Sequence, residues 1–141
     1  MRLSRKADYA IRAMVDLAGQ PQGERVPIHD IAKRQDIPYT FLPRIIPDLV
    51  KGGLLKSYRG ANGGIILARS PAEISILKII ETTDGLVSLN RCTAVPSECD
   101  RQNTCTIHPV WRKVQDEFDS TLGKTSLADI INGPVLRSKR P

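Results

Sequence analysis

Apolar residues recur at three- and four-residue intervals along the first part of the chain, a period typical of amphipathic helices. Ser4 can cap the first of these helices, and Gly52 and Gly53 can end the third in a left-handed conformation. The second and third are short and joined by a tight turn at Asp36, so they predict a helix-turn-helix. The predicted helices span residues 3–18, 27–34 and 40–51.

Two short apolar runs follow, one on each side of a glycine-rich segment. They cover residues 54–59 and 65–69, and Asn62-Gly63 lies between them. Apolar runs around an Asn-Gly pair are typical of a β-hairpin. A hairpin placed directly after a helix-turn-helix is a wing.

The chain then alternates between helical and irregular patterns. Ser70 and Glu73 have capping-box spacing and predict the start of a helix that ends before Asp84. Residues 90–108 show no period and predict a loop. Ser126 can cap a last short turn.

A long helix is predicted from Pro109, with apolar residues at alternating three- and four-residue spacings as on a coiled-coil seam. The chain offers little else to cover this stripe, so we expect a homodimer in which two copies of the helix cross. Packing of this helix against the first helix is the alternative. The stripe consists of Trp111, Val114, Phe118 and Thr121/Leu122.

Composition and charge indicate a globular chain outside the membrane whose partner is negatively charged. The 141 residues are 40% hydrophobic and 26% charged, typical of an ordinary globular chain. No apolar run reaches the roughly 18 residues of a membrane helix, and the N-terminus has no signal-peptide pattern, so we expect a cytoplasmic protein. Residues 1–70 carry 12 Lys/Arg against 6 Asp/Glu, whereas residues 71–141 carry 9 of each. This excess predicts a polyanionic partner, a generally basic surface being the alternative.

The helix-turn-helix and wing supply candidate DNA contacts. Arg44 faces outward near the start of the helix expected in the major groove, and Arg59 at the wing tip can enter the minor groove. Glycine amides at the wing can approach phosphates without side-chain obstruction. The predicted DNA-binding residues are Tyr39, Thr40, Arg44, Arg59, Gly60, Asn62 and Gly63.

Two prolines conflict with the third helix, because an interior proline costs about 3 kcal/mol. Pro43 falls near the helix start, where its missing N–H would be unpaired anyway. Pro47 removes the hydrogen bond to the Pro43 carbonyl. We therefore expect a bend at Pro47 or a break into two turns.

Three cysteines and a histidine form the spacing Cys92-x6-Cys99-x5-Cys105-x2-His108. An odd number of cysteines cannot form a closed disulfide set, and a cytosolic setting keeps thiols reduced. Thiolates and imidazole suit either a tetrahedral zinc or an iron-sulfur cluster. The wide gaps favour a cluster, since zinc ligands usually pair at two- to four-residue spacing. Buried structural cysteines would need more apolar sequence than this loop has.

Several motifs that occur in a fixed order along the chain support an iron-sulfur regulator. They are the opening segment 1–14, residues 30–54, the wing 59–64, the cysteine loop with Cys92, Cys99 and Cys105, and His108-Pro-Val-Trp. Together they resemble the IscR-type family of iron-sulfur winged-helix transcription regulators, from Met1 to about Ile131. The resemblance implies a homodimer whose cluster is held by the three cysteines. It also implies operator binding that depends on the cluster, as a sensor of cluster supply, iron or nitric oxide.

Two residues distinguish sensor types within this resemblance. His108 matches the fourth ligand of the IscR branch, which carries a 2Fe-2S cluster. Asp8 matches the position from which nitric-oxide-sensing members with a 4Fe-4S cluster supply an aspartate from the partner subunit. We expect His108 to be the fourth ligand of a 2Fe-2S cluster. The alternative is that Asp8 is the fourth ligand of a 4Fe-4S cluster. Pro43 replaces a polar residue of many relatives, so their operator preference does not carry over.

The sequence thus predicts a mainly α fold with a small β-hairpin wing, a winged helix-turn-helix followed by a long dimerisation helix. The predicted function is a homodimeric regulator, such as a repressor, that binds operator DNA and no membrane or small-molecule substrate. A zinc-dependent or metal-free regulator is one alternative, and an iron-sulfur carrier or redox enzyme is another. No nucleotide-binding glycine motif or paired nucleophile and base supports an enzyme. The predicted parts are a DNA-binding domain (1–82), a cluster-binding loop (83–108), a dimerisation helix with a terminal turn (109–131) and a flexible basic tail (132–141).

Overall fold

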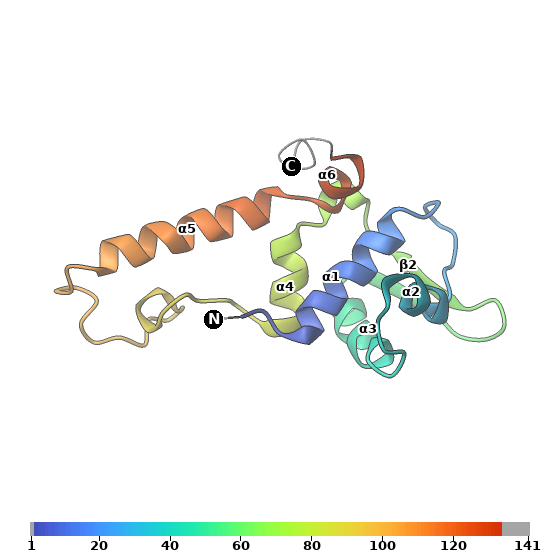
Figure 1. Ribbon diagram of the computed structural model, residues 1–141, viewed down its shortest axis with the longest axis horizontal. Coiled ribbons are helices and arrows are strands. Elements are labelled where there is room, and N and C mark those ends of the chain that lie inside the picture. Colours follow the sequence, from blue (N-terminus) through green and yellow to red (C-terminus); the bar gives the residue numbers. More distant parts are fainter. Residues whose placement is uncertain (1, 134–141) are drawn as a thin grey trace.

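The computed structural model describes residues 2–133 (Figure 1). Within these residues the predicted fold is confirmed: helices predominate, and one antiparallel hairpin forms the wing. The helices are α1 (Arg5–Ala18), α2 (Ile28–Gln35), α3 (Leu42–Lys51), α4 (Ile76–Asp84), α5 (His108–Lys124) and α6 (Leu127–Asn132). The strands are β1 (Leu55–Tyr58) and β2 (Gly64–Leu67), and two 3₁₀ turns are η1 (Pro71–Glu73) and η2 (Arg91–Thr93). The predicted basic tail falls almost entirely in residues 134–141, outside the described part of the chain.

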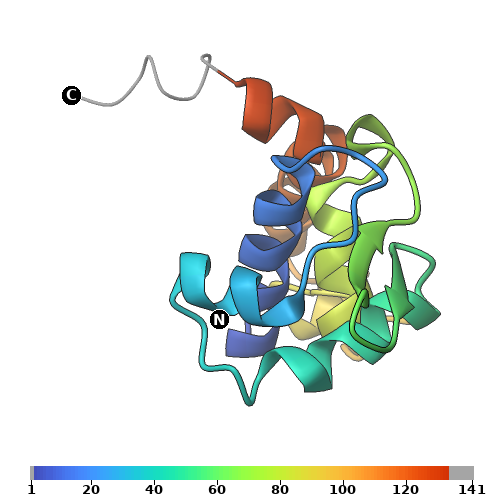
Figure 2. The ribbon, with the colours of Figure 1, turned by 90° about the vertical axis from the view of Figure 1, so that its right-hand side faces the viewer.

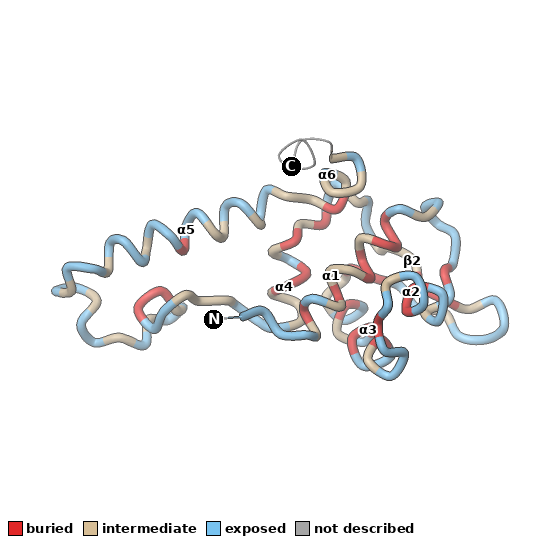
Figure 3. Tube along the Cα trace, viewed as in Figure 1, coloured by how far each residue is buried: buried red, intermediate tan, exposed pale blue. Residues whose placement is uncertain are grey.

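Helix α1 lies at the centre of the winged helix and contacts α2, α3, α4 and α6. Its inner face combines small alanines with Met14 and Leu17, so neighbouring helices can approach closely. Ser4 caps it as predicted, its Oγ accepting a hydrogen bond from the Ala7 N–H at 3.0 Å. Most buried positions in Figure 3 lie on these packed helices.

A buried carboxylate joins α1 to the helix-turn-helix. Asp16 accepts hydrogen bonds from Arg34 Nη2 at 2.7 Å and from Gln35 Nε2 at 3.0 Å. The hydrogen bond to Asp16 raises the pKa of Arg34 above its ordinary value, so the guanidinium stays charged. The C-terminal turn of α2 is therefore held against α1, and Asp36 then takes the left-handed conformation that ends the helix.

Helix α3 runs without interruption from Leu42 to Lys51, so of the two expected effects of Pro47 the break into two turns is wrong, and the bend stays a prediction. It begins two residues later than predicted, because residues 39–41 form a turn. Pro43 and Pro47 are both exposed, so neither ring disturbs the core. On the opposite face, burying four aliphatic side chains at about 1.5–3 kcal/mol each outweighs the lost backbone hydrogen bond. These side chains are Leu42, Ile45, Ile46 and Leu49.

The predicted cap of the fourth helix is also wrong. Ser70 makes no side-chain cap hydrogen bond, and the residues after it form only η1. The cap of α4 is Ser75, whose Oγ accepts from the Lys78 N–H at 3.1 Å. The reason is Ile74, which is fully buried and extended, and whose carbonyl accepts from the Leu127 N–H. An extended residue at that position prevents one continuous helix.

The wing is supported by a segment from before the helix-turn-helix. Strands β1 and β2 pair from Leu55↔Leu67 to Tyr58↔Gly64. Val26 exchanges backbone hydrogen bonds of 2.9 and 3.0 Å with Ile65 and so extends the sheet by one residue. Gly64 has a φ of 143°, and a Cβ there would lie 2.6 Å from the Val26 carbonyl oxygen.

Helix α5 and the segment before it form an arm that extends from the winged helix (Figure 1). The chain leaves the core after Gly85, turns at the His108 end of α5 and returns along α5. It re-enters the core at Leu127, which is fully buried. Ser126 caps α6 as predicted, accepting from the Asp129 N–H at 3.1 Å. Within residues 2–133, no helix is both long and apolar enough to cross a membrane.

Substitution Gly64→Ala should lower the free energy of unfolding by about 3 kcal/mol, because it adds a contact with Val26 to the cost of a positive φ. Gly23→Ala is the matched control: its φ is also positive, at 84°, but nothing lies within 4 Å of the added Cβ. That control should cost about 1 kcal/mol. Urea denaturation measures both, and equal losses would show that the Val26 contact contributes nothing.

Candidate DNA-binding surface and cysteine loop

The outer face of α3 divides into a charged side and an apolar side. Arg44 and Lys51 are exposed on the charged side. Asp48, the one acidic residue of α3, pairs with Lys6 of α1, so its charge is balanced locally. Pro43, Pro47 and Val50 are exposed on the apolar side. This face therefore presents a net positive charge beside a strip without side-chain hydrogen-bonding groups.

The turn before α3 is held by two aromatic contacts. Phe41 packs edge-to-face on Tyr9 of α1, with ring centroids 5.0 Å apart. Tyr39 makes a similar contact with His29 of α2 at 5.4 Å, yet 53% of its surface remains exposed. Tyr39 and Thr40 thus lie just outside the helix, exposed beside the first turn of α3, rather than within it.

The wing tip is stiffened by an arginine that the sequence reading missed. Arg25 stacks on the Tyr58 ring, with Cζ 3.7 Å from the ring centroid. Its Nη1 donates to the Asn62 carbonyl oxygen at 3.4 Å. These contacts join residues more than 30 positions apart, so no local pattern signals them. Arg59 is exposed at the same tip, and the hairpin lies against α3 (Figure 2).

The cysteines lie in one loop, but their thiols are not gathered. Cys92, in η2, is buried, and Cys99 and Cys105 are half-buried. Among the described residues, no group of three or more Cys, His, Asp or Glu side chains is arranged to hold a metal ion. Arg91 and Glu98 exchange two hydrogen bonds of 3.0 Å that close the segment around Cys92.

His108 is the first residue of α5, and one of its imidazole nitrogens lacks a hydrogen-bond partner among the described residues. Its Nδ1 is buried, and within residues 2–133 it has no hydrogen-bond partner. A buried nitrogen without a partner costs free energy unless something binds it. Three thiols and this imidazole are soft ligands that fit an iron-sulfur cluster. Asp8, in contrast, is exposed and pairs with Arg12 Nε at 3.5 Å.

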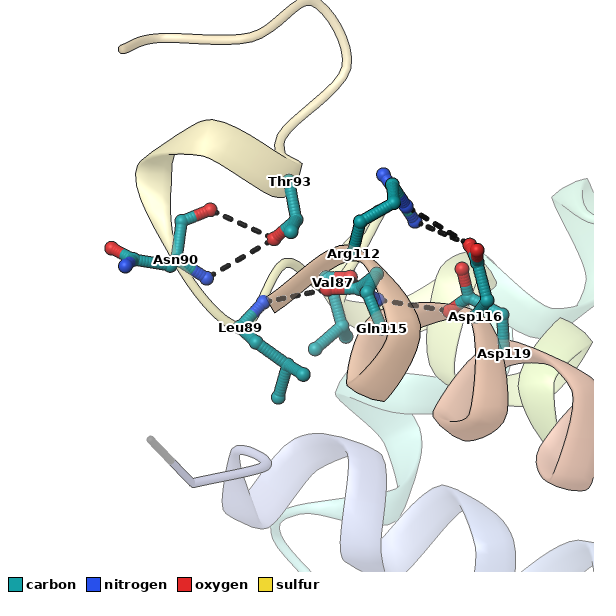
Figure 4. Close-up of polar contacts among 8 residues, drawn as sticks. All are labelled: Val87, Leu89, Asn90, Thr93, Arg112, Gln115, Asp116 and Asp119. Atoms are coloured by element: carbon teal, nitrogen blue, oxygen red, sulfur yellow. Dashed lines mark hydrogen bonds and ion pairs between the residues drawn. The ribbon is translucent and has the colours of Figure 1, made fainter. Parts of the chain in front are cut away.

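Gln115 fastens the start of the cysteine loop to α5 (Figure 4). Its side chain is 2% exposed; Oε1 accepts from the Leu89 N–H at 2.7 Å, and Nε2 donates to the Val87 carbonyl oxygen at 3.0 Å. Nε2 also donates to Asp119 at 3.0 Å. The role of Gln115 could not be predicted from the sequence, because its partners Leu89 and Val87 lie 26 and 28 positions away and no local pattern signals the contact.

The apolar stripe of α5 remains largely uncovered in the single chain. Val110, Trp111 and Val114 are 51%, 37% and 40% exposed. Phe118 and Leu122 are half-buried and line a shallow hollow with Val114. The main contacts of α5 are with α4 and η2, not with α1 as the intrachain alternative required. An apolar face of this kind marks an interaction surface.

Comparisons with known proteins agree with this architecture. Residues 3–133 match the Rrf2 family, described as an iron-dependent transcriptional regulator. The transcriptional regulator IscR of Yersinia pestis is 35% identical over 132 residues, which cover 94% of this chain and 80% of that protein. Both the expected family resemblance and the expectation that the chain is no enzyme are confirmed, since these relatives are named transcriptional regulators.

Two solved structures share the fold. T. potens IscR superposes with a TM-score of 0.76 at 30% identity, covering 100% of this chain and 93% of that one. CymR, the global cysteine regulator of B. subtilis, has a TM-score of 0.76 at 27% identity, covering 92% and 95%. The likeness to T. potens IscR includes the arm, because all of this chain is covered.

Substitution Gln115→Leu should free the start of the cysteine loop, because it leaves the half-buried Leu89 N–H and Val87 carbonyl without their partner. The expected cost is about 2 kcal/mol in the free energy of unfolding. Hydrogen exchange at Leu89 should accelerate, while exchange in α1 stays slow. Lys113→Leu, at an exposed position on α5, is the control. Unchanged exchange at Leu89 in Gln115→Leu would rule out the clamp.

Proposed function

The chain belongs to the Rrf2 family and is a transcription regulator of the IscR type, and from this premise we propose that an iron-sulfur cluster controls its operator binding. One observation carries the proposal. The loop that holds all three cysteines ends at a histidine whose buried Nδ1 has no partner in the described residues. The same chain presents a basic winged helix.

The proposed DNA contacts follow from the exposed residues of α3 and the wing. α3 enters the major groove, where Arg44 reads a base edge and Tyr39 and Thr40 contact the adjacent backbone. Arg59 enters the minor groove. The amides of Gly60, Asn62 and Gly63 approach phosphates at the wing tip. Arg25 supports this arrangement by fixing the carbonyl of Asn62.

The proposed assembly is a homodimer through α5. Crossing two copies of this helix would cover the exposed Val110, Trp111 and Val114. Each copy of α5 is joined at its C-terminal end to a winged helix, so dimerisation brings two copies of α3 to one DNA molecule. Two recognition helices fit an operator with two half-sites.

The proposed ligands are Cys92, Cys99, Cys105 and His108, and the proposed group is a 2Fe-2S cluster. When bound, it supplies a link among these side chains that is sensitive to oxidation and to iron supply. The chain's own residues transmit the difference. Gln115 ties the start of the loop to α5, and His108 ties its end to the first turn of the same helix. The state of the loop thereby biases how α5 sits against α4 and the winged helix.

Arg44 and Arg59 test the DNA-binding surface. We expect Arg44→Ala to weaken binding about ten- to one-hundred-fold and to relax the preference at one base pair per half-site. Arg59→Ala should weaken binding and change the preference only at the flanking steps. Fluorescence anisotropy on duplexes selected from a random library measures both effects at fixed salt. Lys124→Ala removes the same charge from the C-terminal end of α5, outside α3 and the wing, and should leave affinity unchanged. An equal loss in all three variants would contradict specific contacts.

Analysis of iron, sulfide and zinc in protein purified without oxygen tests the cluster. We expect two irons and two sulfides per chain, and an absorption spectrum that His108→Ala changes and Asp8→Ala does not. Four of each, with a spectrum sensitive to Asp8→Ala, would replace the proposal by a 4Fe-4S sensor. Zinc alone, or no metal, would contradict control by a cluster and leave a regulator of the same fold. The Cys92, Cys99 and Cys105 triple alanine variant is the control without ligands.

A further inference from the structure

The apolar side of α3 adds nothing to the hydrophobic core of the described residues. Pro43, Pro47 and Val50 follow one another at four- and three-residue spacing, so they lie along one line of the helix surface. All three are exposed, and none belongs to the hydrophobic core. Pro47 even deprives the helix of a backbone hydrogen bond. Pro43 suits the first turn of α3, whereas neither the hydrophobic core nor the helix geometry calls for a proline at position 47.

The surroundings of this strip point to a polyanion as its occupant. Arg44 and Lys51 lie beside it on the same helix, and Lys6 balances the charge of Asp48. The wing next to α3 adds Arg59. A purely apolar partner would bury these charges without an opposite charge or a hydrogen-bond acceptor, which costs free energy. Charge complementarity therefore assigns the strip to the floor of the DNA major groove.

Only one chemical group in that groove suits a proline side chain. The pyrrolidine ring has no donor or acceptor, and the proline nitrogen carries no hydrogen, so neither residue can bond to a base edge or a phosphate. Among the base edges exposed in the major groove, the C5-methyl of thymine is the apolar group. The rigid ring also loses almost no side-chain entropy on contact.

We propose that Pro43 and Pro47 read thymine C5-methyl groups, so that each half-site of the operator contains thymine under the first two turns of α3. The inference rests on the proposed DNA binding and adds a preference for thymine in the operator sequence. Arg44 lies on the neighbouring line of the helix and reads an adjacent base pair through hydrogen bonds. The recognition helix thereby combines one polar reader with two apolar readers.

Replacement of thymine by deoxyuracil tests this directly, because it removes only the methyl group. Duplexes are first enriched from a random library with the wild-type protein, and each thymine of an enriched duplex is then replaced singly. We expect at least one thymine per half-site at which the replacement weakens binding about four-fold, the value of one buried methyl group. Thymines outside the protected footprint are the internal control and should show no effect.

The Pro43→Ser, Pro47→Ser double variant connects that penalty to these residues. Both positions are exposed, so the variant should fold, and thermal unfolding checks this. Its binding should no longer distinguish thymine from deoxyuracil at the sensitive positions. The inference is overturned if wild type shows no penalty, if enriched half-sites lack thymine, or if the penalty persists in the variant. Failure to enrich any duplex overturns the proposed DNA binding as well.

Discussion

The organisation of the molecule depends on the point where the chain re-enters the winged-helix core. There the Leu127 N–H donates to the Ile74 carbonyl and the Ile76 N–H to the Thr125 carbonyl, both at 2.9 Å, and the Leu127 side chain is fully buried. Because the chain leaves the same core after Gly85, α5 and the cysteine loop are anchored at both ends. In the proposed function, a change in the loop acts on residues packed against α1 and α4, the helices that also support α3.

Two buried polar side chains connect the functional segments to this frame. Asp16 holds the end of α2 and so fixes the entry to the helix-turn-helix. Gln115 holds the start of the cysteine loop on α5. In both cases the buried group has its hydrogen bonds satisfied, which stabilises one arrangement over alternatives. The arrangement leaves Arg44 of α3 and Arg59 of the wing tip exposed.

Features encoded within a few residues could be predicted from the sequence. The cap at Ser4, the hairpin around Asn62-Gly63 and the cap at Ser126 all formed as expected. Two predictions were wrong because long-range packing determines these features. The fourth helix is capped at Ser75 and not at Ser70, since Ile74 pairs with the start of α6, and α3 does not break into two turns at Pro47, since its buried aliphatic face keeps it continuous. The contacts of Arg25 and Gln115 join segments distant in sequence, so no local pattern could reveal them. Cys92, Cys99, Cys105 and His108 could be identified from the sequence as one candidate set, yet within residues 2–133 they are not arranged to hold a metal ion.

One titration tests whether the state of the cysteine loop is coupled to DNA binding. The affinity of a single selected duplex is measured without oxygen for the iron-loaded protein and again after chelation of the iron, with the triple cysteine-to-alanine variant treated identically. We expect chelation to change the wild-type affinity about ten-fold or more, a coupling within the usual range for linked sites, and to leave the affinity of the variant unchanged. Equal wild-type affinities before and after chelation would contradict this coupling.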